Sequence, residues 1–182
     1  MNNKEIELKF VIDKQIKTQI IYDLEQKTHK ICKNRLIDTY YIPNFRKFEI
    51  NGETMECVRI RENDNGAVLA YKKIHREANP VYCDEYETKV ESKEETEKIL
   101  FALGFNVQMV IDKTRITYSL EGLEFDFDSV KGLGELLEVE LKNSDDVSVI
   151  YDFVSKYGLT EEDVTYKGIQ VLMKEAMKKE TN

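Results

Sequence analysis

The sequence predicts an α+β protein in which about eight strands form a largely antiparallel β-barrel and the helices pack outside it. Strand-like segments are separated by short turn signals such as Asn65-Gly66 and Glu121-Gly122, which favour antiparallel neighbours. Helical patterns gather at only a few points along the chain. Because about eight strands are enough to close a barrel, we expect the sheet to be closed.

Composition limits the class of protein. The chain has 182 residues, which suits a single domain over residues 1–182. Charged residues make up 34%, yet 41% are hydrophobic, as in a folded protein. The net charge of −8 argues against nucleic acid as a partner, and no apolar run is long enough to span a membrane. The three cysteines are widely spaced and fit reduced thiols, so we expect a cytoplasmic location.

The first half of the chain reads as strand, helix and then four further strands. Alternation predicts a strand over residues 5–12. Asp13 is a good N-cap, and Ile20 and Leu24 stand at helical spacing, which predicts a helix to about residue 31. Asn51-Gly52 favours a turn. The other strands are expected over residues 36–42, 57–61, 67–73 and 83–90, the middle two joined at Asn65-Gly66.

The second half of the chain begins with a helix. Ser92-Lys93-Glu94-Glu95 is a capping box that opens this helix, and Gly104 ends it. Three strands follow, over residues 107–118, 123–128 and 136–141. Two helices are expected after them, over residues 145–157 and 160–178, the second with its own capping pattern at residues 160–163.

Four segments alternate charged and mostly apolar residues. Side chains at i and i+2 share one face of a strand, so each segment places its charges together on one face. An isolated pair of this kind is usually a solvated sheet face, and a structural barrel with a charged exterior remains the alternative. Repetition with the signs sorted by strand favours a charged interior that binds a metal and a polyanion. The segments are Glu5-Ile6-Glu7-Leu8-Lys9, Arg59-Ile60-Arg61, Lys113-Thr114-Arg115 and Glu138-Val139-Glu140.

Two groups of candidate site residues follow from the signs. Magnesium prefers oxygen ligands, a few of them carboxylates, and arginine and lysine bind phosphate as a planar fork and as a point charge. Buried charges of this number are tolerated when they pair or bind ions. The expected metal group is Glu5, Glu7, Glu138 and Glu140, and the expected phosphate group is Lys9, Arg59, Arg61, Lys72, Lys113 and Arg115.

The order and spacing of these motifs resemble the CYTH superfamily, the triphosphate tunnel metalloenzymes, over nearly the whole chain. The N-terminal segment resembles the family's E-x-E-x-K signature. The other matching motifs are Asp38-Thr39-Tyr40-Tyr41, Arg59-Ile60-Arg61, Tyr71-Lys72-Lys73, Glu85-Tyr86-Glu87, Lys113-Thr114-Arg115, Asp128 through Gly132-Leu133-Gly134 to Glu138-Val139-Glu140, and Thr165-Tyr166. One departure concerns the central E-x-E, which Cys83-Asp84 precede where family members often have an arginine.

The resemblance implies an eight-stranded tunnel that binds a triphosphate together with Mg²⁺ or Mn²⁺. Family members include inorganic triphosphatases, thiamine triphosphatases and class IV adenylyl cyclases. By the same resemblance Glu5, Glu7 and Glu140 hold the metal, with Glu138 beside them. We expect a metal-dependent triphosphate hydrolase in which Glu87 and Lys72 are the candidate catalytic side chains. An adenylyl cyclase and a non-catalytic polyphosphate or nucleotide binding protein are the alternatives, and a homodimer is possible.

Overall fold

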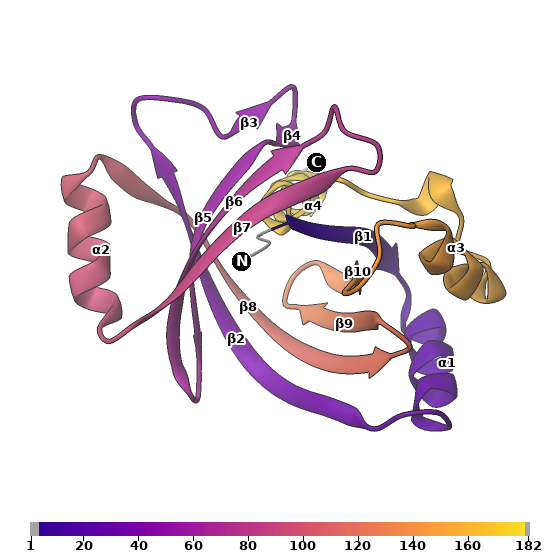
Figure 1. Cartoon of the computed structure of the whole chain (residues 1–182). Helices are drawn as coiled ribbons and strands as arrows, with labels where there is room; N and C mark the ends of the chain where they lie inside the picture. The colour runs from indigo at the N-terminus through magenta and orange to yellow at the C-terminus, as the bar shows by residue number, and fades with distance from the viewer. Residues whose placement is uncertain (1–3, 181–182) are drawn as a thin grey trace.

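The computed structural model describes residues 4–180, which form one barrel with helices around it (Figure 1). Within residues 4–180, no helix is long and apolar enough to cross a membrane. In chain order the elements are β1 (Lys4–Ile12), α1 (Lys14–Glu25), β2 (Lys30–Pro43), β3 (Glu49–Ile50), β4 (Glu53–Thr54), β5 (Glu56–Asn63), β6 (Gly66–His75), β7 (Tyr82–Val90), α2 (Lys93–Ala102), β8 (Phe105–Leu120), β9 (Leu123–Val130), β10 (Gly134–Leu141), α3 (Ser148–Val154), η1 (Ser155–Tyr157), η2 (Glu161–Asp163) and α4 (Ile169–Glu180).

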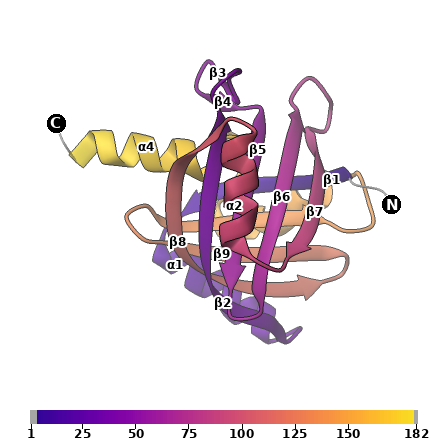
Figure 2. The same ribbon diagram turned by 90° about the vertical axis from the view of Figure 1, so that its left-hand side faces the viewer.

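Eight strands form a closed barrel in the order β1-β10-β9-β8-β2-β5-β6-β7. Every pairing in it is antiparallel, and β7 closes the barrel by pairing with β1, where Glu5 lies opposite Cys83. Seen from the side, β2, β5, β6 and β7 run steeply while β1, β9 and β10 cross behind them (Figure 2). The predicted closed antiparallel barrel is confirmed.

The main hydrophobic core lies outside the barrel wall. On β1 the residues Ile6, Leu8 and Phe10 face outward and are almost fully buried. They pack with buried side chains of α1 and α3, while α2 covers a second apolar cluster on the opposite side (Figure 1). Strand residues of the other parity therefore face the barrel interior. The predicted arrangement, with apolar faces outward under helices, is confirmed.

One end of the barrel is closed by α4. Tyr40, Val130 and Leu136 face the interior at this end and pack against Ile169 and Met173 of α4. Just before α4, the backbone N–H of Gly168 donates to Thr54 Oγ1 at 3.1 Å, which ties the chain to the end of β4. Ile169 and Gln170 at the start of α4 therefore line the interior at this end.

The predicted helix to residue 31 is wrong in its end. α1 stops at Glu25, and residues 26–29 form a turn in which Lys27 and Thr28 donate to the carbonyl oxygen of Leu24. β2 starts at Lys30 because the long partner strand β8 continues to Leu120 and pairs with it. Pairing with a strand distant in the sequence therefore overrides the local helical pattern of the residues from Lys30 onward.

The predicted helix over residues 160–178 is also wrong at its start. The capping box of Thr160 and Asp163 is present, but it caps only the short η2. Val164 then bridges Phe10, and the backbone N–H of Thr165 donates to the carbonyl oxygen of Lys9 at 2.8 Å. These contacts with β1 hold the segment extended, so α4 begins at Ile169.

Candidate functional site

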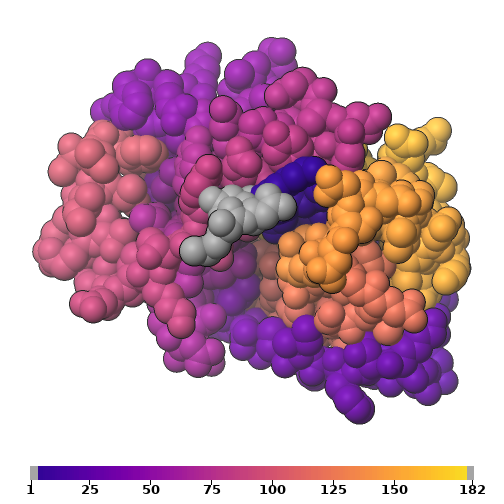
Figure 3. All heavy atoms as spheres, in the orientation of Figure 1, coloured from indigo at the N-terminus to yellow at the C-terminus, as the bar shows by residue number. Residues whose placement is uncertain are grey.

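A cavity of about 560 Å³ occupies the barrel interior. Basic and acidic side chains line it in nearly equal number, and most come from alternate positions of the strands. In the space-filling view the start of β1 (indigo) reaches the surface between the magenta of β6 and β7 and the orange segment after β10 (Figure 3). The residues predicted from the sequence all line this cavity: Glu5, Glu7, Lys9, Arg59, Arg61, Lys72, Glu87, Lys113, Arg115, Glu138 and Glu140.

Three carboxylates form a row across β1, β10 and β9. Glu140 lies directly opposite Glu7 on one side and Glu124 on the other. Like charges opposite each other in a sheet repel. Burial, with Glu138 and Glu5 nearby, raises the pKa of Glu7, and burial with Glu5 and Glu124 nearby raises the pKa of Glu140 to about 7. Lys142 Nζ lies 2.6 Å from Glu140 and 3.0 Å from Glu124 and compensates part of this repulsion, and a further cation beside Glu7 and Glu140 would relieve the rest.

Glu138 is in a different electrostatic state from Glu7 and Glu140. Its carboxylate lies 3.1 Å from Lys9 Nζ and accepts a hydrogen bond from Arg115 at 2.6 Å. Burial alone raises the pKa of a carboxyl group, but Lys9 and Arg115 hold the pKa of Glu138 well below its usual range. Its charge is therefore already compensated.

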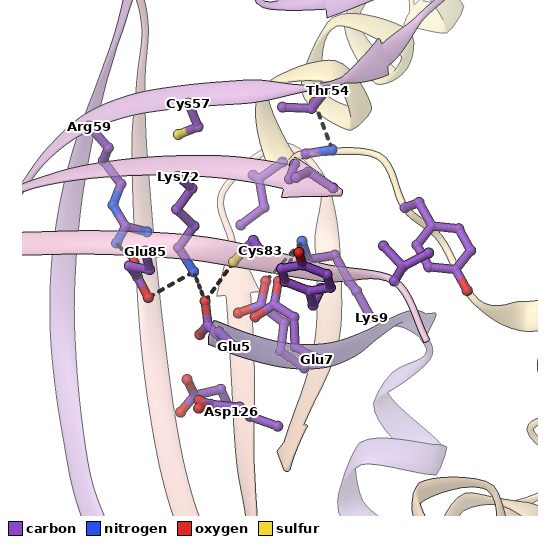
Figure 4. A pocket seen from close by; sticks show the side chains of 18 of the residues that line it. Glu5, Glu7, Lys9, Thr54, Cys57, Arg59, Lys72, Cys83, Glu85 and Asp126 are labelled. Carbon is purple, nitrogen blue, oxygen red and sulfur yellow. Dashed lines mark hydrogen bonds and ion pairs between the residues drawn. The ribbon is translucent and has the colours of Figure 1, made fainter. Parts of the chain in front are cut away.

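The fourth predicted metal ligand, Glu5, is paired with a lysine. Lys72 Nζ donates to Glu5 Oε2 at 2.6 Å and lies 3.2 Å from Glu85 Oε2 (Figure 4). Cys83 Sγ also donates to Glu5 Oε2, at 3.1 Å. Within residues 4–180 no three acidic, histidine or cysteine side chains converge as metal ligands, because lysine and arginine contacts hold several of them apart. The structure brings the predicted metal group into one cavity but not to one point.

Asp38 on β2 is a site residue that the charge pattern did not single out. Its side chain is fully buried and accepts from Arg61 Nε at 2.7 Å and Arg61 Nη2 at 2.8 Å. Lys113 Nζ lies 3.5 Å from it and Arg59 Nη1 3.8 Å. Burial opposes its charge, but these cations hold the pKa of Asp38 far below its usual value. The available signal was its place two residues before Tyr40, on the same face of a predicted strand.

A second buried carboxylate, Asp128 on β9, binds the cations of the adjacent strand β8. Lys113 Nζ donates to it at 2.6 Å, and Arg115 binds it through Nε at 2.7 Å and through Nη2. Arg115 also contacts Asp126 and Glu138. The Lys113 side chain has no exposed surface, and burial with Arg115 nearby lowers its pKa to about 8. Lys113 is therefore the most enclosed of the predicted phosphate-binding cations.

Arg59 has a buried donor without an acceptor. Its Nε carries a proton, is buried, and has no hydrogen-bond partner among the described residues. Its Nη2 lies 3.4 Å from Glu87 Oε1 and 3.9 Å from Glu85 Oε1, both loose contacts. A buried N–H that lacks a partner costs free energy unless an anion accepts from it. This geometry fits a phosphate oxygen beside Arg59.

The residues present also fit a divalent cation. The cavity offers hard carboxylate oxygens, and burial together with neighbouring carboxylates raises the pKa of two groups in the acidic row, Glu7 and Glu140. Mg²⁺ and Mn²⁺ prefer such oxygen donors, together with water and phosphate oxygens. Glu7 has only a loose cationic contact, with Lys9 Nζ at 3.8 Å, and Glu140 is paired with Lys142 at 2.6 Å, with Glu5 beside them.

A closed antiparallel barrel with an ionic interior and an apolar exterior under helices defines a tunnel protein that suits a small polyanion. The sequence profile of the CYTH domain matches residues 3–170, and the chain belongs to this family. Its members include triphosphatases and proteins related to adenylate cyclase. The family is generally dependent on divalent metal.

Relatives with known sequence or structure support the same grouping. A Methanocaldococcus jannaschii protein that bears a provisional adenylate cyclase name is 33% identical over 142 residues, 78% of each chain. The PH1012 protein of Pyrococcus horikoshii has a TM-score of 0.77 and 26% identity, covering 93% of this chain and 99% of that one. A Hippeastrum protein described as having a dominant triphosphatase activity has a TM-score of 0.61 and 16% identity, with 91% and 90% covered. At that identity the likeness concerns the fold.

Proposed function

We propose that the protein is a divalent-metal-dependent hydrolase of a triphosphate, inorganic or organic, that lies along the tunnel. The observation that carries this proposal is the buried Arg59 Nε, a donor that faces an ionic cavity and has no acceptor among the described residues. The acidic row of Glu7, Glu140 and Glu124 supplies the second half of the argument, because a polyanion alone is repelled by it.

The cations divide the work of holding the phosphates. Arg59, Arg61 and Lys72 come from β5 and β6, whereas Lys9 comes from β1, two strands from β6, and Arg115 from β8, two strands from β5. Contacts from several strands around the barrel would hold a phosphate chain extended and fix the terminal phosphorus. Phosphoryl transfer depends mainly on such positioning and on compensation of charge.

Glu5, Glu7 and Glu140, with Glu138 beside them, are the residues that would hold Mg²⁺ or Mn²⁺. When bound, the ion neutralises charge on the phosphate oxygens. Glu87 is about half exposed and lies beside Arg59, which suits a group that orients a water molecule toward the terminal phosphorus. Lys72 lies 3.2 Å from Glu85, which is on the same strand as Glu87, and is the second candidate catalytic side chain.

Product analysis tests the proposal. Purified protein is incubated with Mg²⁺ or Mn²⁺ and, separately, with tripolyphosphate, thiamine triphosphate and ATP, and the products are resolved as phosphate, pyrophosphate, ADP and cyclic AMP. We expect metal-dependent release of phosphate, lost on addition of EDTA. Absence of turnover of all three substrates, with binding retained, would leave a non-catalytic triphosphate binding protein.

An adenylyl cyclase is the second candidate, favoured by the name of the Methanocaldococcus jannaschii relative. A cyclase would bind the triphosphate of ATP through the same cations, but the ribose 3′-oxygen attacks the α-phosphate and pyrophosphate leaves. Cyclic AMP and pyrophosphate in equal amounts from ATP would establish it and would refute hydrolysis as the reaction.

A further inference from the structure

Cations that are expected to bind phosphate are in contact with carboxylates that are expected to bind metal. Lys72 Nζ is 2.6 Å from Glu5 Oε2, and Lys9 Nζ is 3.1 Å from Glu138 Oε1. Each side chain has one charge to offer, so a lysine held by a carboxylate is a weaker ligand for phosphate. The carboxylate is likewise a weaker ligand for a metal. The two proposed binding functions therefore compete for the same partners.

Lys72 reaches Glu5 across an intervening strand. It lies opposite Glu85 of β7 in the sheet register, and β7 in turn pairs Cys83 with Glu5 of β1. Its ammonium sits between the carboxylates of Glu5 and Glu85 (Figure 4). The side chains of Lys72 and Glu5 are 20% and 13% exposed, so solvent screens this pair much less than it screens a surface pair.

Lys72 is also the cation that can leave its carboxylate partner, Glu5, most readily. Glu138 contacts both Lys9 and Arg115, so losing one of them leaves it paired. Glu5 has Lys72 as its one cationic contact within residues 4–180, and it keeps the Cys83 thiol as a donor if Lys72 moves. A lysine has a flexible four-carbon stem and a compact charge, so its ammonium can move from one anion to another without moving the backbone.

We propose that Lys72 is an exchangeable counter-ion that links metal binding to phosphate binding. In the metal-free protein it neutralises Glu5. When Glu5 takes a divalent cation, the ammonium of Lys72 is released and turns to a phosphate oxygen in the same cavity. This inference rests on the proposed function, and it adds that metal and triphosphate each raise the affinity for the other through one side chain.

Metal binding without substrate tests the exchange. Free Mn²⁺ is measured by electron paramagnetic resonance while it is titrated into the wild type and into Lys72→Met, which keeps the length of the side chain but not its charge. We expect about tenfold tighter Mn²⁺ binding in the variant, about 1.4 kcal/mol. Lys73→Met is the matched control, because Lys73 is the exposed neighbour on the outer face of β6 and the change in net charge is the same. The control should leave the affinity for Mn²⁺ unchanged.

Anion binding should change in the opposite direction. In EDTA, tripolyphosphate binding measured by calorimetry should weaken in Lys72→Met. A merely structural defect weakens both ligands, so tighter Mn²⁺ together with weaker tripolyphosphate identifies the exchange. Lys72→Arg retains the charge and can bind a carboxylate with two donors, so it should weaken Mn²⁺ binding. That variant keeps the test decisive if Lys72→Met fails to fold.

A charge-balanced variant separates pairing from the general field. Lys72→Met combined with Glu85→Gln removes one charge of each sign, and tighter Mn²⁺ binding should persist because Glu5 is still released. Loss of the tightening in this variant would overturn the inference. No Mn²⁺ binding by the wild type would refute the metal dependence of the proposed function. Mn²⁺ binding that Lys72→Met leaves unchanged would refute only the exchange.

Discussion

Asp38→Asn probes the buried counter-ion that holds the arginines of β5. Asp38 has no exposed surface, binds Arg61 with two hydrogen bonds and lies within 3.8 Å of Lys113 and Arg59. Removing one partner of a buried ion pair leaves an uncompensated charge, which typically costs about 3–5 kcal/mol. Asparagine keeps one acceptor oxygen, so we expect a loss of about 3 kcal/mol in the free energy of unfolding, at the lower end of that range.

The outer face of β2 offers a matched control. Arg35 on β2 binds Asp112 on β8 with the same two-donor geometry, at 3.0 and 2.8 Å. Arg35 is 69% exposed, so water already solvates both charges. Exposed pairs of this kind contribute little to stability. Asp112→Asn should therefore leave the unfolding curve nearly unchanged.

Urea denaturation followed by circular dichroism measures both variants at pH 7 and pH 5. The pKa of Asp38 in the folded protein lies far below its ordinary value of 3.8, so the folded state binds fewer protons than the unfolded chain. The stabilisation is complete above pH 3.8 and is lost only as the pH falls through the folded pKa. The difference between wild type and Asp38→Asn should thus be equal at the two pH values. Equal costs for Asp38→Asn and Asp112→Asn would refute the reasoning from burial.

Three further outcomes are expected. In a phosphate-release assay, Arg59→Met should lower kcat/KM for the triphosphate by ~10²- to 10³-fold, because a hydrogen-bond donor to the transition state is lost. Arg35→Met on the outer face of the barrel should match the wild type in the same assay. Because the pKa of Glu140 is raised to about 7, protonation of Glu140 should weaken Mn²⁺ binding as the pH falls from 8 to 6. Titrations followed by electron paramagnetic resonance should find a smaller pH dependence of Mn²⁺ binding in Glu140→Gln. An equal pH dependence in the variant would exclude Glu140 as its source. Gly168→Ala places a methyl group 2.7 Å from Thr54 Oγ1, the acceptor of the Gly168 backbone N–H, so it should destabilise the protein by about 1–3 kcal/mol in urea denaturation. Unchanged stability would contradict this prediction.

Helix boundaries show where local sequence stops being informative. Asp13 caps α1 as predicted, because a capping hydrogen bond involves only neighbouring residues. The end of α1 was mispredicted because β8 recruits residues from Lys30 onward into a ladder. Likewise the capping box at Thr160 formed, but contacts with Lys9 and Phe10 of β1 kept the following residues out of a helix.

The sequence alone determined the interior of this protein. The period of two along a strand is a local property, so the alternation in residues 5–9 and 138–140 was sufficient to place charges on one face and apolar residues on the other. The apolar faces could then be satisfied only under helices. The same alternation identified the residues that line the tunnel.

Only the tertiary structure decided which charges meet. Lys72 contacts Glu5 because barrel closure places β6, β7 and β1 side by side, and Asp38 contacts Arg61 because β2 and β5 pair in one register. Strand order and register depend on the whole closed sheet, so they are not encoded in any single segment. The pairing of predicted metal ligands with predicted phosphate ligands is a consequence of that closure.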